Sequence, residues 1–157
     1  MQILVDADAC PVKDIIMSQA RDNDLTVLLV SSISHFSTKE LPEGVERIWV
    51  DKGSDLADFE IMKLAYPNDI VVTQDYGLAS MLLPKRCRIL HHSGYEYTEQ
   101  SIQRLVDSRH LSAQLRRQTR SSRVKSEDPF KHEPQTPFDE LLERVIQEQL
   151  KKLKEIE

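Results

Sequence analysis

The chain has 157 residues, of which 39% are hydrophobic and 30% charged, and this composition is typical of one globular domain with room for a terminal appendage. Four glycines and seven prolines exclude collagen-like sequence, and no apolar run approaches the roughly 18 residues that a membrane span requires. The net charge of −5 argues against a protein that coats DNA. Acidic residues stand where an export signal would be apolar, and two cysteines cannot form a framework of several disulfides, so we expect a cytoplasmic protein.

The first two thirds of the chain alternate short apolar runs with amphipathic stretches. Strands are expected where aliphatic and β-branched residues cluster, at residues 2–5, 26–30, 47–50, 70–73 and 88–90. Helices are expected to begin at Pro11, after Ser54 as N-cap, and at about Tyr76. The single tryptophan, Trp49, is expected in the core. The alternation predicts a doubly wound, mostly parallel α/β sheet.

The last third of the chain is predicted to be helical. Thr98 can cap a helix that continues into an arginine-rich stretch. Residues 119–135 are polar and contain two prolines, which predicts a linker or arm. A final amphipathic helix is expected over residues 136–157, and its apolar face must cover either the sheet or a second copy of the chain, which allows a homo-oligomer. The expected organisation is an α/β domain over residues 1–118, the linker and this C-terminal helix.

Aspartates follow three of the predicted strands, as Asp6 with Asp8, Asp55 with Asp58, and Asp75. In a doubly wound sheet, ligands bind beyond the carboxyl ends of the strands, where the strand order reverses. If the first and fourth strands are neighbours, Asp6, Asp8 and Asp75 converge in one crevice. Carboxylates this close raise one another's pKa unless a cation lies between them.

An all-aspartate cluster suits Mg²⁺ or Mn²⁺ better than zinc, because hard cations prefer oxygen ligands. One or two such ions would activate water for phosphodiester cleavage. The candidate catalytic residues are Asp6, Asp8 and Asp75, and the candidate metal ligands are Asp6, Asp8, Asp55, Asp58 and Asp75. A structural interpretation stays open for each acid, since Asp55 and Asp58 suit a helix N-terminus and Asp75 can cap the helix that follows it.

A basic segment follows the predicted α/β domain. Residues 104–125 hold six arginines, one lysine and a single acid, a local charge of +6. This segment is either a solvated helix face or a surface that grips the RNA backbone, since arginine pairs with phosphate in bidentate fashion. The candidate nucleic-acid-binding residues are Arg104, Arg109, Arg116, Arg117, Arg120, Arg123 and Lys125.

The motifs around the aspartates carry a family resemblance. The segment VDADACPVK at residues 5–13 resembles the start of the YaiI/YqxD family of bacterial proteins, and residues 53–58, 73–79 and 97–102 match that family's later motifs. The resemblance covers roughly residues 1–117 and implies a fold and acid placement like those of PIN nucleases. It therefore implies Mg²⁺- or Mn²⁺-dependent cleavage of RNA, with Asp6, Asp55, Asp58 and Asp75 at the site.

The chain departs from the expected patterns at two positions. An aspartate stands where a mid-chain glutamate is common in PIN nucleases. Ser93 stands before Gly94 where an arginine is expected in the family, which removes a basic contact.

Two other functions remain open. Asp6 and Asp8 also resemble the acids of haloacid-dehalogenase phosphohydrolases, but Cys10 occupies a position that usually holds threonine or valine there. Cys10 itself is expected to be structural, because neighbouring acids oppose its thiolate. The third alternative is a PIN-like scaffold that binds RNA or a protein without cutting it.

Overall fold

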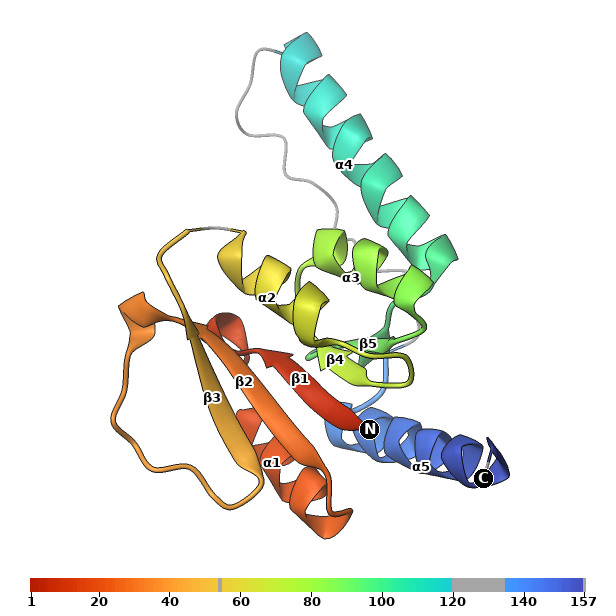
Figure 1. The fold of residues 1–157 in the computed structure, drawn as a ribbon. Helices are drawn as coiled ribbons and strands as arrows, with labels where there is room; N and C mark the ends of the chain where they lie inside the picture. Colours follow the sequence, from red (N-terminus) through yellow and green to blue (C-terminus); the bar gives the residue numbers. More distant parts are fainter. Residues whose placement is uncertain (54, 120–134, 157) are drawn as a thin grey trace.

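The computed structural model describes residues 1–53, 55–119 and 135–156, and within them a six-stranded sheet carries helices on both faces (Figure 1). The strands are β1 (Gln2–Asp6), β2 (Thr26–Ser32), β3 (Val45–Val50), β4 (Ile70–Val72), β5 (Arg88–His91) and β6 (Tyr95–Glu96). The helices are α1 (Lys13–Asp22), α2 (Leu56–Leu64), α3 (Tyr76–Leu82), α4 (Glu99–Thr119) and α5 (Phe138–Ile156). Short 3₁₀ turns are η1 (Ala7–Ala9), η2 (Ile33–His35) and η3 (Leu83–Lys85). The predicted α/β class is confirmed.

The strand order is β3-β2-β1-β4-β5-β6. Strands β1 to β5 pair in parallel, and β6 is antiparallel to β5. The chain proceeds outward from β1 to β3, returns so that β4 pairs with the free side of β1, and continues outward to β5. The strand order therefore reverses between β1 and β4, the position where such sheets bind ligands. The first and fourth strands are neighbours, so the condition for the aspartates that follow them to converge is met.

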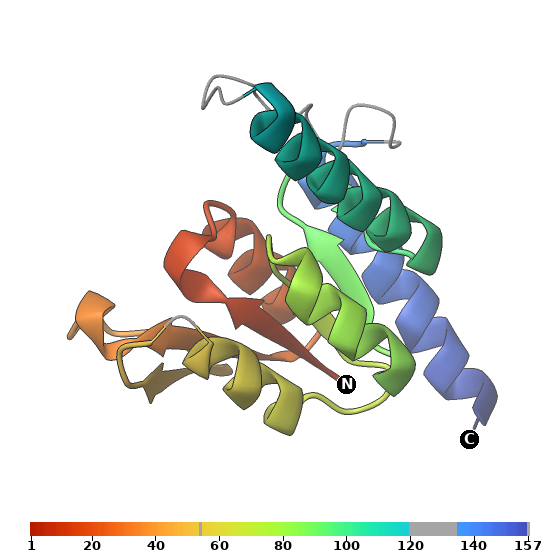
Figure 2. The same ribbon diagram turned by 90° about the horizontal axis from the view of Figure 1, so that it is seen from above.

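Both faces of the sheet are covered, which explains why the strands are apolar without alternation. In β1, Ile3 and Val5 pack in a cluster with α1 and α5, whereas Leu4 packs in a second cluster with α2, α3 and the start of α4. All three side chains are inaccessible to solvent. Figure 2 shows α1 and α2 on opposite sides of β1 and β2.

The apolar face of α5 covers the sheet of its own chain. Its apolar residues are buried against β1, β4 and α1: Phe138, Leu141, Leu142, Val145 and Ile146. The start of α5 is held at Gly94, whose carbonyl accepts a hydrogen bond of 3.0 Å from the backbone N–H of Thr136. Gly94 has φ +97°, and a Cβ at this position would collide with the carbonyl of Thr136. This face of α5 is thus not free to bind a second copy of the chain.

The structure corrects several details of the predicted elements. Strand β2 extends to Ser32, and the 3₁₀ turn η2 occupies part of the predicted loop. The two-residue strand β6 was not predicted, because so short a segment carries no periodicity. Ser54, the predicted cap of α2, lies outside the described residues, and the N-cap residue of α2 is Asp55.

The prediction that Trp49 belongs to the core is wrong. Trp49 lies on β3, an edge strand, and is only partly buried. Its ring packs against Phe36 of the loop that precedes β3, with the ring centroids 5.0 Å apart. An edge strand has a neighbour on one side only, so a large side chain near its end can be covered by a loop instead of a helix.

The long helix α4 is anchored at its first turns and extends away from the sheet (Figure 1). Ile102 and Leu105 are buried, whereas Leu111 and Leu115 are exposed. Among the described parts of the chain, no helix combines the length and apolar character needed to cross a membrane.

Candidate active site

Asp6 and Thr73 meet at the carboxyl ends of β1 and β4. Asp6 is the last residue of β1, and Thr73 directly follows β4. The Thr73 hydroxyl donates to Asp6 Oδ2 at 3.1 Å and accepts a hydrogen bond from the backbone N–H of Asp75 at 3.0 Å. The buried hydroxyl of Thr73 therefore links two of the predicted site aspartates across the switch point.

Asp75 has a structural role at the N-terminus of α3. Its Oδ1 accepts hydrogen bonds from the backbone N–H groups of Gly77 at 2.8 Å and Leu78 at 3.3 Å. The structural interpretation of Asp75 as a helix cap therefore holds. The capping bonds also fix the orientation of the Asp75 carboxylate beside Asp58 and Asp6.

Asp58 brings α2 to the same site. Burial, the charge of Asp75 and a hydrogen bond with Asp75 together account for most of the rise that brings the pKa of Asp58 to about 7. The charges of Asp6 and Asp55 add smaller contributions. The aspartates that act on Asp58, together with Asp58 itself, are called the acidic cluster below: Asp6, Asp55, Asp58 and Asp75.

Within the acidic cluster, Asp6 and Asp55 differ in burial. Burial is the largest cause that raises the pKa of Asp6, and the hydrogen bond from Thr73 lowers it. The charges of Asp75 and Asp8 raise the pKa of Asp6 as well. Asp55 is exposed at the N-terminus of α2 and forms no capping hydrogen bond. Asp55 thus contributes charge at the rim of the cluster.

The fifth aspartate, Asp8, is held on the side of the acidic cluster that faces β2. Its Oδ2 accepts a hydrogen bond of 2.9 Å from the backbone N–H of Ser32, and its Oδ1 lies 3.1 Å from His35 Nδ1. These contacts connect η1 to the end of β2. The phosphohydrolase alternative requires the second aspartate as an acid beside the first, and here that carboxylate is occupied by Ser32 and His35.

The acidic cluster offers suitable atoms for a hard cation but no finished coordination sphere. Its donors are carboxylate oxygens and one hydroxyl, the ligand chemistry of Mg²⁺ and Mn²⁺. In the described part of the chain, no group of three or more His, Cys, Asp or Glu side chains is already arranged to hold a metal ion. The residues fit such an ion chemically, because their donor atoms are all oxygens.

Arginine reaches the acidic cluster from α4. The guanidinium of Arg109 donates a hydrogen bond of 2.8 Å from Nη1 to the hydroxyl of Tyr76 and lies 6.0 Å from the centre of that ring. This hydrogen bond is the main cause that raises the pKa of Arg109, and the charge of Asp75 adds to it. Tyr76 thereby holds a cation on the side of the cluster next to α3.

The other predicted basic residues are described only in part. Arg104 and Arg117 are exposed on α4, as is Arg109. Arg116 belongs to α4, but its side chain lies outside the described part of the structure. Arg120, Arg123 and Lys125 also lie outside the described residues.

Three residues of the site were not predicted: Thr73, Tyr76 and Tyr97. Tyr97 is buried, and its hydroxyl donates to the carbonyl of Thr73 at 3.2 Å. Burial, and then the charge of Asp75, raise the pKa of Tyr97, so it remains a neutral donor. The Thr-x-Asp spacing at residues 73–75 was the available signal, because a hydroxyl two residues before an N-cap can bond its backbone N–H.

Both cysteines are buried free thiols. Burial is the largest cause that raises the pKa of Cys10, and the charge of Asp6 contributes in the same direction. A thiol kept protonated is a poor nucleophile. The structure therefore favours the structural interpretation of Cys10.

Comparison with known proteins identifies the family. The family described as "Uncharacterized BCR, YaiI/YqxD family" matches residues 4–148. UPF0178 proteins of Bacillus anthracis (strain A0248) and of Bacillus cereus (strain AH820) are each 49% identical to the chain over 146 residues, which cover 93% of this chain and 99% of theirs. No solved structure matches the chain. The resemblance in the sequence motifs is thus confirmed, and the chain belongs to the YaiI/YqxD family.

Proposed function

We propose that the chain is a ribonuclease that hydrolyses phosphodiester bonds at the acidic cluster with the help of Mg²⁺ or Mn²⁺. The observation that carries the proposal is the mutual interaction of Asp6, Asp58 and Asp75, which come from three different elements at the switch point of the sheet. Acids grouped in this way disfavour one another's charge unless a proton or a cation intervenes. Perturbed carboxyl groups of this kind are typical of functional sites.

The proposal assigns distinct roles to the residues of the cluster. Asp6 and Asp75 hold the ion, because Thr73 and the α3 N-terminus orient their carboxylates. A bound ion supplies positive charge against the phosphate oxygens and lowers the pKa of a water molecule. Asp58 holds a proton near neutral pH in the free protein, since its pKa is about 7. Asp58 would have to lose this proton to contribute its charge to a bound ion, so the affinity for the ion should rise with pH.

The arginines of α4 position the substrate in this proposal. Arg109 is held by Tyr76, the residue next to Asp75, and can pair with a phosphate group beside the scissile one. Arg104 and Arg117 extend the positive charge along α4. RNA affinity should therefore fall with salt, with a slope of about −0.7 per neutralised phosphate on a single strand. Changing Arg104, Arg109 and Arg117 together to Ala should reduce both the affinity and this slope.

The deciding experiment is cleavage of single-stranded RNA by the purified chain, with Mn²⁺, with Mg²⁺ and with EDTA. Activity should require the ion and should be lost in Asp6→Asn and in Asp75→Asn, where asparagine can still cap α3. The matched control is Asp22→Asn, an exposed acid at the far end of α1, which should keep full activity. Cleavage that survives both substitutions overturns the proposal.

Two further measurements separate the alternatives. Turnover of p-nitrophenyl phosphate with an aspartyl-phosphate on Asp6 would establish the phosphohydrolase instead. RNA binding without cleavage under all ion conditions would establish the non-catalytic scaffold.

A further inference from the structure

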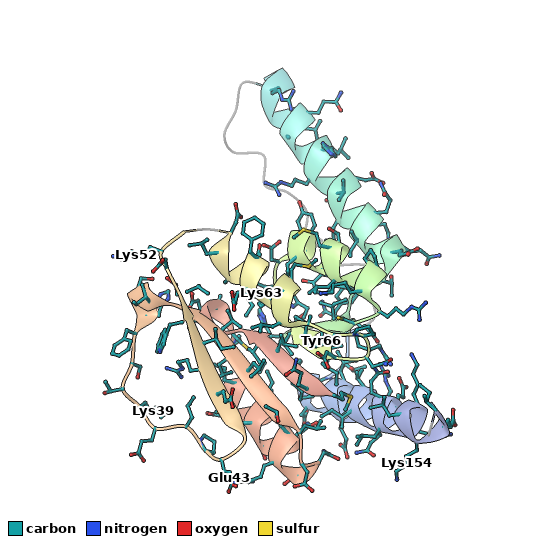
Figure 3. All side chains as sticks on the ribbon, in the orientation of Figure 1. Lys39, Glu43, Lys52, Lys63, Tyr66 and Lys154 are labelled. Atoms are coloured by element: carbon teal, nitrogen blue, oxygen red, sulfur yellow. The ribbon has the colours of Figure 1, made fainter. Side chains whose placement is uncertain are left out.

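A second pocket lies on the α1 side of the sheet, next to the acidic cluster but distinct from it. It has a volume of about 360 Å³ and lies between η1, α1, the middle of β3 and the loop of residues 35–42. Its basic lining residues are Lys13, His35, Lys39 and Arg47. Figure 3 labels Lys39 on the loop that leads to β3. Pockets of about this size accommodate small organic ligands.

An aromatic pair adjoins the lining of this pocket in the sequence, since Phe36 stands between the lining residues His35 and Ser37. The rings of Phe36 and Trp49 lie 5.0 Å apart, and the Arg47 guanidinium carbon lies 5.1 Å from the centre of the Trp49 ring. Phe36 is 62% exposed although it is a large apolar residue. A nucleobase can stack on such a ring whatever its sequence, because every base has a π-face. The arrangement of a stacking ring beside cations is typical of single-strand nucleic-acid binding.

The guanidinium group of Arg47 has a buried N–H donor that forms no hydrogen bond within the described residues. This donor is Nε. A buried donor without a partner costs free energy. An acceptor atom on a bound ligand would satisfy it, which distinguishes Arg47 from an ordinary surface arginine.

The pocket and the acidic cluster both lie toward the carboxyl ends of the parallel strands. Asp6 pairs with Val30 of β2, and Val30 pairs with Ile48 of β3, the residue before Trp49. Two strand spacings of about 4.8 Å therefore separate these positions across the sheet, or roughly 10 Å. One single-stranded RNA a few nucleotides long can therefore contact both sites.

We propose that the pocket and the Phe36–Trp49 pair bind one nucleotide of a single-stranded RNA whose scissile bond lies at the acidic cluster. The base stacks on Phe36, and its phosphate contacts Arg47 and Lys39. This inference rests on the proposed function, because it supplies that function with the binding site for a flanking nucleotide.

The acids of the pocket shape what it accepts. Asp8 is already held by the Ser32 N–H and His35. Asp14 and Glu40 also line the pocket and can accept hydrogen bonds from the N–H groups of a base. Their charge opposes the binding of a free anion. The pocket therefore favours a nucleotide within a strand over inorganic phosphate.

The test uses the single tryptophan as a local reporter, with the full chain in EDTA so that cleavage plays no part. A single-stranded oligouridylate of about ten nucleotides should quench Trp49 fluorescence saturably. Anisotropy of the labelled oligonucleotide should show about 10-fold weaker binding for Phe36→Ala, and a smaller loss for Lys39→Gln. Uridine monophosphate and inorganic phosphate should bind at least about 10-fold more weakly than the strand.

Matched controls come from the last turn of α2 and its connection to β4, at the amino end of β4. Tyr66→Ala removes another exposed aromatic ring and Lys63→Gln another exposed lysine, and both should bind like the parent. Equal binding by Phe36→Ala and the parent, or uridine monophosphate binding as tightly as the strand, overturns the inference. Metal-dependent cleavage without Trp49 quenching refutes this inference alone. Quenching without cleavage under any ion condition refutes the proposed function and overturns the role of this site in cleavage, and leaves only nucleotide binding at the pocket.

Discussion

The two ends of β4 carry aspartates in opposite environments. At the amino end, Asp69 is only 3% exposed. Its carboxylate accepts hydrogen bonds from the backbone N–H of Gln2 at 3.1 Å, the Gln2 side chain at 3.0 Å and the backbone N–H of Tyr66 at 2.9 Å. At the carboxyl end, Asp75 caps α3 but also faces Asp58 and Asp6.

This difference separates a structural acid from a candidate functional one. The charge of Asp69 is compensated by donors that tie β1 to the α2–β4 connection, so it stabilises the fold. The acids of the cluster have few donors and oppose one another's charge, so they store electrostatic free energy that a cation would release. Substitutions at the two ends should accordingly change stability in opposite directions.

The largest effect is expected at Asp69. Changing Asp69 to Ala leaves its three donors without a partner in a buried position, which should lower the free energy of unfolding by about 3 kcal/mol. Urea denaturation measures this loss. Asp69→Asn keeps one acceptor oxygen and should lose about half as much. An unchanged free energy of unfolding in Asp69→Ala would mean that the amino end of β4 does not depend on this carboxylate.

The next effect is stabilisation by the ion. Mn²⁺ at about 100 times its dissociation constant should raise the free energy of unfolding by about 2.7 kcal/mol, because only the folded chain presents the cluster. Thermal unfolding with and without Mn²⁺ measures the gain. Asp6→Asn should abolish most of it, and Asp22→Asn should not. If the melting temperature does not change with Mn²⁺ but rises in Asp6→Asn, the acidic cluster does not bind the ion.

The sequence predicted the parallel α/β sheet, because its strands are short and strongly apolar, but it left the strand order open. Asp6 follows the first strand and Asp75 follows the fourth. Their convergence required only that these two strands be neighbours, and they are. The prediction could not separate Asp8 from Asp6, because the 3₁₀ turn η1 redirects the chain within two residues. A turn of this length has no periodic signature in the sequence.

Contacts between distant segments were the other part that escaped prediction. The link from Thr73 to Asp6 spans 67 residues, and the contact of Arg109 with Tyr76 spans 33. Neither pair forms a local motif. The position of Trp49 was mistaken for the same reason, since only the fold shows that β3 is an edge strand with Phe36 beside it.

Thr73 tests whether the cluster depends on its single hydroxyl. Thr73→Val keeps the volume of the buried side chain but removes its bonds to Asp6 and to the N–H of Asp75, which should cost about 1.5 kcal/mol. The pKa of Asp6 should rise further, because the Thr73 hydrogen bond lowers it in the parent. Urea denaturation and carboxyl NMR titration measure the two effects. An unchanged Asp6 titration would show that the hydroxyl does not stabilise this carboxylate.

The smallest effect concerns the pH dependence of stability at Asp58. In the folded chain its pKa is about 7, against 3.8 as the ordinary value. Between these two values the folded state keeps a proton that the unfolded state has lost, so the free energy of unfolding falls as pH rises. The loss is complete above pH 7. Because Asp58 is partly exposed, we expect the effect to be on the order of 1 kcal/mol.

Asp58→Asn should remove this pH dependence, since asparagine carries no proton to lose. In EDTA the variant should match the parent below pH 3.8 and exceed its stability above pH 7 by on the order of 1 kcal/mol. Urea denaturation across this pH range measures the difference. Asp69→Asn is the matched comparison, because it should destabilise the chain at neutral pH where Asp58→Asn stabilises it. If both variants lost stability above pH 7, the two ends of β4 would not differ in the way that the structure indicates, and the acidic cluster would be a structural element like Asp69.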